Sequence, residues 1–232
     1  MAILRILSGG AAQAVVEQIA ERFEQETGHT VDAEFSAVGA MAAKLSAGEP
    51  ADLAILTAAL IDELAGKGLI VSGSRADVGR VGTGVAVRGG APLPDVSSEA
   101  ALRANLLAAR KILCPDPAVA TAGKVVLNLL ARLGIADEVR GAMQFFPNGY
   151  AAMSALAAGR GALEIGITQM TEIRANKGVT LAGPLPGVLQ VHTMYSAGLA
   201  VRSAAPDIAR AFLAQLAGPA ARPILAAAGF EV

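Results

Sequence analysis

The chain has few of the residues from which metal and redox sites are built. It contains one cysteine, Cys114, and two histidines, and it has no HExxH or CxxC motif. A single cysteine cannot form an internal disulfide, and in the strand-like segment KILCP we expect a buried, inert thiol. We therefore expect neither a bound metal nor a cofactor.

Aromatic residues and an excess of one charge are also lacking. Tryptophan is absent and aromatic residues make up 3% of the chain, so Ala, Val, Leu and Ile must build most of the core. The net charge of −1 and the scattered charged residues provide no basic surface for nucleic acid or an anionic membrane. No stretch approaches the roughly 20 apolar residues of a membrane span. We expect no nucleic-acid partner and no membrane insertion.

The N-terminal residues lack the features of an export signal. They have no basic region, no uninterrupted apolar region and no small-residue cleavage site before folded-looking sequence begins. As printed, the chain is expected in the cytoplasm. A mature form whose leader had been removed would look the same and would be periplasmic. The sequence also has no GxSxG motif and no P-loop.

Strand-like and helix-like hydrophobic patterns alternate along the chain. Val31, Ala33 and Phe35 alternate as in a half-buried strand, whereas residues 15–23 and 125–133 carry apolar residues at helical spacing. This alternation predicts an α/β fold with mostly parallel sheets flanked by helices. We assign residues 1–80 and 198–232 to one lobe and residues 81–197 to a second. Two crossovers would form a hinge, with a ligand in the cleft between the lobes.

The segment from residue 4 to residue 56 predicts where that ligand binds. Two loops and two helix N-termini should lie at the carboxyl ends of neighbouring parallel strands, where open α/β sheets hold ligands. Helix N-termini offer unpaired N–H groups to anions, so we expect a small anionic ligand. The candidate ligand-binding residues of the two loops are Ser8, Gly9, Gly10, Ala11, Ser36, Val38 and Gly39.

The second lobe and the crossovers supply further candidates. The predicted ligand-binding residues at helix starts are Thr121, Ala122, Gly123, Asn148 and Tyr150. Arg80, at the first crossover, could clamp a carboxylate or could be an exposed linker charge. If the protein is an enzyme, the candidate proton-transfer groups are Tyr150, His192 and Lys124.

Several motifs resemble the periplasmic molybdate-binding proteins and their relatives, which are type II solute-binding proteins of ABC importers. The resemblance spans nearly the whole chain and is carried by GEPADL, DPAVATAGKVVLNLLARLGI, GALEIGIT and LAGPAARPILAAAGF. It implies a two-lobed type II periplasmic-binding-protein fold. A transporter is an expected partner only if the protein is exported.

The same resemblance shows departures at the ligand loops. The family presents serine hydroxyls where this chain has Ala11 and Val38, with Ser8 and Ser36 nearby but shifted. The family's tyrosine after the strand LEIGIT corresponds to Gln169. A buried oxyanion needs a partner for each oxygen, so the loss of these hydroxyls predicts a ligand other than molybdate.

Three functions remain open from the sequence. The first is capture of a small anion without chemistry. The second is an isomerase on the same scaffold, since aconitate isomerase, which interconverts cis- and trans-aconitate by an allylic proton shift, is known to resemble these binding proteins. The third is a ligand-sensing domain, although no DNA-binding segment precedes residue 1.

Overall fold

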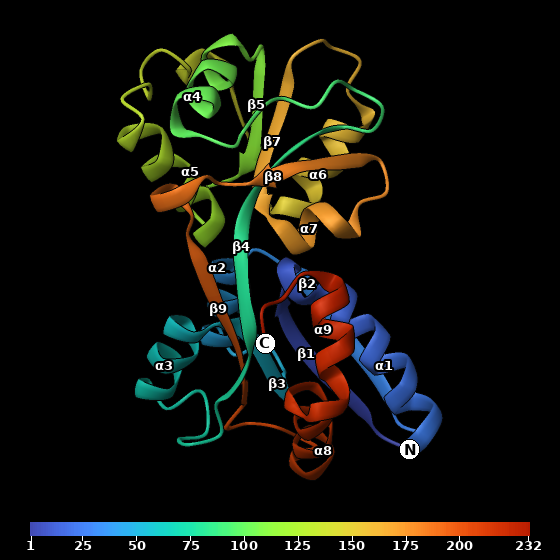
Figure 1. Ribbon diagram of the computed structural model, residues 1–232. Coiled ribbons are helices and arrows are strands. Elements are labelled where there is room, and N and C mark those ends of the chain that lie inside the picture. The colour runs from blue at the N-terminus through green and yellow to red at the C-terminus, as the bar shows by residue number, and fades with distance from the viewer. The chain divides into compact units, whose positions relative to one another are not determined.

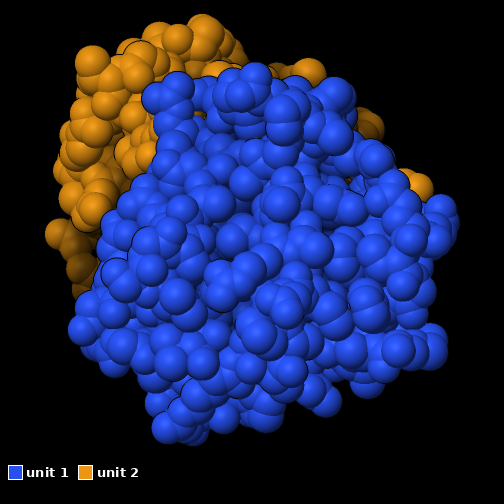
Figure 2. Space-filling view, turned by 90° about the horizontal axis from the view of Figure 1, so that it is seen from below, with its two compact units in different colours: residues 1–81, 193–232 blue, residues 82–192 orange.

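The computed structural model describes all 232 residues, and the chain forms two compact units (Figure 2). Unit 1 comprises Met1–Val81 and Thr193–Val232, and unit 2 comprises Gly82–His192. The return crossing therefore comes five residues before the predicted one. The reason is that Tyr195 to Leu199 form backbone hydrogen bonds as an antiparallel strand with Leu53 to Thr57, which belong to unit 1.

Unit 1 contains a mixed sheet with the strand order β2-β1-β3-β9-β4. Its strands are β1 (Ile3–Gly9), β2 (Thr30–Ser36), β3 (Leu53–Thr57), β9 (His192–Leu199) and β4 (Ala76–Arg88). β1 runs parallel to both β2 and β3, whereas β9 runs antiparallel to β3. The carboxyl ends of β1, β2 and β3 therefore lie at the same edge of the sheet.

Helices cover the sheet of unit 1 (Figure 1). They are η1 (Gly10–Ala12), α1 (Gln13–Thr27), α2 (Val38–Ser46), α3 (Ala58–Gly66), α8 (Pro206–Ala217), η4 (Pro219–Ala221) and α9 (Arg222–Ala228). The helical spacing of Val15, Val16, Ile19 and Phe23 buries one face of α1. Phe23 packs edge-to-face on Phe212 of α8 with ring centroids 5.3 Å apart, so two of the few aromatic residues stabilise the core.

Unit 2 contains a second mixed sheet, in the order β8-β4-β7-β5-β6. Its remaining strands are β5 (Lys111–Pro115), β6 (Met143–Phe146), β7 (Glu164–Gln169) and β8 (Val179–Pro184). β5 is parallel to β6 and β7, and β4 is antiparallel to β7 and β8. Its helices are α4 (Glu99–Ala108), α5 (Thr121–Arg132), η2 (Arg140–Ala142), α6 (Gly149–Ala158), α7 (Met170–Ala175) and η3 (Gly187–Leu189).

Two hydrophobic clusters lie in unit 2. The first includes Val85, Ile167 and the apolar face of α5. The second includes Ala86, Leu113 and residues of α6 and α7. Because successive strand residues point to opposite faces, these clusters mark the two faces of the sheet.

The predicted α/β class with sheets flanked by helices is confirmed, and several local details differ. β8 was not predicted, because its sequence VTLAGP offers little hydrophobic alternation. The cap of α4 is the Ser98 side chain, whereas the hydroxyl of the neighbouring Ser97 donates a hydrogen bond to the carboxylate of Asp95. Cys114 is buried as predicted, and burial raises the pKa of its thiol to about 12. No helix combines the length and apolar character needed to cross a bilayer.

Candidate functional site: strand ends and helix N-termini

The loops that follow β1 and β2 meet at the carboxyl edge of the unit 1 sheet. A Cβ atom on Gly9 would lie 2.6 Å from Val38 Cγ1 and 3.3 Å from Tyr195 Cε1. Only glycine fits this close approach. The structure therefore brings Gly9 and Val38, two predicted ligand-binding residues, into contact. It adds the buried Tyr195 of β9, which the sequence analysis did not select.

The serines of these loops differ in their availability. Ser8 is fully buried, and its hydroxyl donates to the Gly9 carbonyl at 3.1 Å. Ser36 is half-buried and makes no side-chain hydrogen bond within the protein. Ser36 is therefore the serine that can offer a hydroxyl to a ligand. Ala11 and Val38 are buried, whereas Gly10 and Gly39 are half-buried.

The helices after the predicted ligand loops share one feature at their N-termini. η1 and α1, which follow β1, α2, which follows β2, and α5, which follows β5, all begin without a side-chain cap. The same holds for α3, α7, α8 and α9, whereas the Ser98 side chain caps α4 and the Asn148 side chain caps α6. An uncapped first turn leaves N–H groups free of an internal acceptor, and these groups attract anions.

In unit 2, the start of α5 is held against the end of β5. A Cβ atom on Gly123 would lie 2.4 Å from the Pro115 carbonyl oxygen, so this helix turn packs directly on backbone. Thr121 is half-buried and Ala122 is buried. Lys124, a candidate for proton transfer, is exposed.

The start of α6 is occupied by a side chain of the protein itself. Glu172, in α7, is 5% exposed and accepts a hydrogen bond of 2.5 Å from the Thr168 hydroxyl. The backbone N–H groups of Gly149, Gln169 and Tyr150 also donate to its carboxylate. Burial raises the pKa of Glu172 to about 7, although these hydrogen bonds act in the opposite direction.

Glu172 changes the interpretation of the predicted residues at α6. Asn148 accepts from the Ala151 N–H at 2.8 Å and acts as the helix cap. The Tyr150 N–H donates to Glu172, and its side chain is 38% exposed. One local signal marks Glu172, because it is an acidic residue in the first turn of a short helix. That signal does not reveal that the carboxylate reaches a second helix.

The remaining candidates lie on the strands β7, β9 and β4. Gln169 is buried at the end of β7, and His192 is exposed at the start of β9. The Arg80 guanidinium lies 3.4 Å from the Glu231 carboxylate, and the backbones of these residues exchange two hydrogen bonds. These contacts of Arg80 hold the C-terminal residues against β4. Its ion pair is exposed, so it contributes little to stability.

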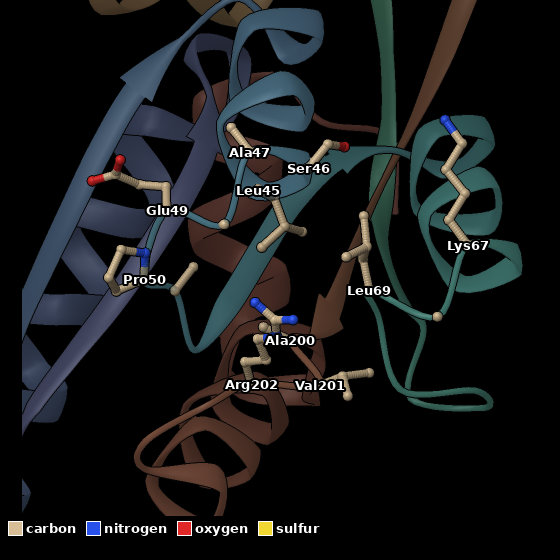
Figure 3. A pocket seen from close by; sticks show the side chains of 13 residues that line it. Leu45, Ser46, Ala47, Glu49, Pro50, Lys67, Leu69, Ala200, Val201 and Arg202 are labelled. Atoms are coloured by element: carbon tan, nitrogen blue, oxygen red, sulfur yellow. The ribbon is translucent and has the colours of Figure 1, made fainter.

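A cavity lies elsewhere in unit 1. It measures about 350 Å³ and is lined by Leu45–Ala51, Lys67–Leu69 and Ala200–Arg202. These segments lie at the amino end of β3, away from the loops that follow the carboxyl ends of the strands. The Glu49 and Lys67 side chains extend away from Arg202 (Figure 3), and Lys67 pairs with Glu63. The cavity therefore gathers no convergent set of polar groups.

The comparisons with known proteins concern the family and the fold of the chain. A family model described as bacterial extracellular solute-binding protein matches residues 4–231. An aconitate isomerase of Pseudomonas sp is 28% identical over 235 residues, covering 98% of this chain and 87% of the relative. Both results concern nearly the whole chain.

Solved structures give the same fold. The periplasmic molybdate-binding protein of Azotobacter vinelandii has a TM-score of 0.81 at 22% identity, with 99% of both chains covered. The sulfate-binding protein SubI of Mycobacterium tuberculosis H37Rv has a TM-score of 0.78 at 18% identity, with 99% of this chain and 86% of that chain covered. At these identities, the similarity establishes the fold.

Proposed function

We propose that this chain, which belongs to the family of bacterial extracellular solute-binding proteins, binds a small anion through the first turns of its uncapped helices. The observation that carries the proposal is the position of these helix starts. η1 with α1, α2 and α5 each follow a predicted ligand loop at the carboxyl end of a strand and leave their N-terminal N–H groups without a side-chain acceptor, a lack of capping that α3, α7, α8 and α9 share. That the two units close on one common ligand stays a prediction.

The side chains at these loops favour a carboxylate over a dehydrated metal oxyanion. Molybdate- and sulfate-binding proteins share the fold, which supports an anionic ligand. In this chain, however, Ala11 and Val38 offer no hydroxyl, and the Ser8 hydroxyl is used internally. A tetrahedral oxyanion needs donors for four oxygens, whereas a carboxylate group needs them for two.

A thermal-shift comparison tests this proposal. We expect cis- or trans-aconitate, as tricarboxylate probes, to raise the melting temperature more than molybdate or sulfate at equal concentration and ionic strength. Binding to the native state adds about 2.7 kcal/mol of stability at roughly 100 times Kd. A larger stabilisation by molybdate would overturn the preference for carboxylates. The absence of a shift with all four probes would overturn the anion-binding proposal itself.

The alternative function is isomerisation of a small tricarboxylate. The relative that supports it is named aconitate isomerase and aligns with 98% of this chain. The candidate proton-transfer groups remain Tyr150, His192 and Lys124. Neither the Tyr150 side chain nor the Lys124 side chain makes a hydrogen bond within the protein. Ultraviolet absorbance of cis- and trans-aconitate distinguishes the two functions. Turnover supports the isomerase, and a thermal shift without turnover supports binding alone.

We further propose that the protein acts outside the cytoplasmic membrane with an importer as its partner. The description of the family as extracellular solute-binding proteins supports this location. Fractionation of cells that carry the complete natural gene tests it. Recovery with cytoplasmic markers would instead favour the enzyme or an intracellular binding protein.

A further inference from the structure

Thr83, in β4, carries a buried hydroxyl that the fold leaves unsatisfied. The residue is 0% exposed, and its Oγ1 atom has no hydrogen-bond partner. Its backbone N–H is satisfied, because it donates to the Gln190 side chain at 3.1 Å and to the Val191 carbonyl at 3.2 Å. Buried polar groups are nearly always paired, so an unpaired hydroxyl requires an explanation.

The register of β4 shows toward which face this hydroxyl points. Cβ atoms on Gly82 and Gly84 would lie 2.9 and 2.7 Å from atoms of Met170, so these positions face α7. Side chains alternate along a strand, so Thr83 points to the opposite face, together with Val85. Val85 belongs to the cluster that contains the apolar face of α5. Thr83 therefore shares the sheet face that α5 covers.

Thr83 also lies at the edge of the sheet where α5 begins. It pairs with Gln169, the last residue of β7, and Gln169 points to the same face as Ile167. β5 runs parallel to β7, so both strands end at this edge. The first turn of α5 packs on Pro115, the last residue of β5, through Gly123. The hydroxyl, Gln169 and an uncapped helix N-terminus thus share one face and one edge of unit 2.

We propose that the Thr83 hydroxyl is a specificity-determining ligand group, which donates a hydrogen bond to an oxygen of the anion held at the first turn of α5. This inference rests on the proposed function and adds a residue that lies outside every predicted loop. The group that the Thr83 hydroxyl recognises is a negatively charged oxygen atom of the ligand. A carboxylate and an inorganic oxyanion both present such an atom, so both are used as probes.

The chain provides a matched control for the loss of a buried hydroxyl. Thr171, in α7, is 4% exposed, and its Oγ1 atom is also unpaired. It belongs to the helix that covers the opposite face of the sheet, because Met170 and Ile173 contact Gly84 there. Valine is close to threonine in shape, so Thr83→Val and Thr171→Val each remove one unsatisfied hydroxyl.

Calorimetric titration of the wild type and three variants with trans-aconitate and with sulfate tests the proposal. For the probe that binds the wild type, we expect Thr83→Val to raise Kd at least tenfold and Thr83→Ser to stay within about threefold. Thr171→Val should leave Kd unchanged. Neither valine variant should have a lower melting temperature than the wild type, because each loses an unpaired buried hydroxyl.

Four results would overturn the assignment of Thr83. Wild-type affinity in Thr83→Val would exclude a ligand contact, as would an equal loss of affinity in Thr171→Val. A lowered melting temperature in Thr83→Val alone would show that the hydroxyl stabilises the fold. If the wild type binds neither probe while Thr83→Val is fully stable, the proposed function fails, and the Thr83 assignment fails with it.

Discussion

The Asp52→Ala variant is expected to lose about 3–5 kcal/mol of unfolding free energy at pH 7, the usual cost of breaking a buried charged network. Asp52 is 1% exposed at the start of β3. Its carboxylate accepts from the Arg5 N–H at 2.8 Å, which ties it to β1. It also accepts from the Ser203 hydroxyl at 2.7 Å and from the N–H groups of Ala204 and Ala205 at 2.9 and 3.1 Å.

Removal of this carboxylate leaves the N–H groups of Arg5 and Ala204 and the Ser203 hydroxyl without their acceptor. The Ala205 N–H keeps a second acceptor, the Ser203 hydroxyl oxygen at 3.1 Å. Burial alone would raise the pKa of Asp52, but the four hydrogen bonds outweigh it and lower the pKa below its ordinary value. The stabilisation is therefore present at neutral pH and is lost as the pH falls through the lowered pKa. Urea denaturation at pH 7 and in the acid range measures both effects.

Asp62→Ala is the matched control for the aspartate substitution. Asp62 pairs with Arg75 at 2.7 Å on the surface, with 59% of its side chain exposed. Exposed pairs contribute about 0–1 kcal/mol, so this variant should remain close to the wild type. Similar losses in both variants would contradict the role assigned to Asp52.

The second large effect concerns Glu172, whose carboxylate lies at the start of α6. Burial raises its pKa from 4.5 to about 7 in the folded protein. Between these two values, the folded state holds a proton that the unfolded state has released. Stability must therefore fall as the pH rises from about 4.5 to 7, by about 3 kcal/mol in total at 1.36 kcal/mol for each pKa unit.

Glu172→Gln is expected to remove that part of the pH dependence, since glutamine does not titrate. Urea denaturation of wild type and variant at pH 5, 6, 7 and 8 gives the difference in slope directly. Glu164→Gln, which changes another buried carboxylate, one paired with Lys111 at 2.9 Å, controls for a general effect of substitution. Parallel stability curves for wild type and Glu172→Gln would refute the raised pKa.

Much of the fold could be predicted because local patterns record it. The helical spacing of Val125, Val126 and Leu129 predicted α5, and these residues are buried on one face. The alternation of Val31, Ala33 and Phe35 predicted β2. Gly28 was predicted to end the first helix, and it adopts φ +70°, which glycine tolerates well.

The candidate site could be predicted only in part. Glycines and small residues after strands identified the loops at Gly9, Val38 and Thr121, because helix starts carry local signals. Asp52, Glu172 and Thr83 gave no comparable signal. Each acts through partners that lie far away in the sequence or on another element, as the bond between Asp52 and Ser203 shows.

The order of residues by itself determined the α/β class, the alternation of strands and helices, and the places where the chain turns, since hydrophobic period and turn chemistry act over a few neighbouring residues. Tertiary structure alone decided which groups other than the local cap reach a helix start. Asn148 caps α6 from the adjacent position in the sequence, whereas Glu172 reaches the same helix start from α7. Hydrogen-bond satisfaction depends on which distant groups the fold brings within about 3 Å, and no local pattern encodes that distance.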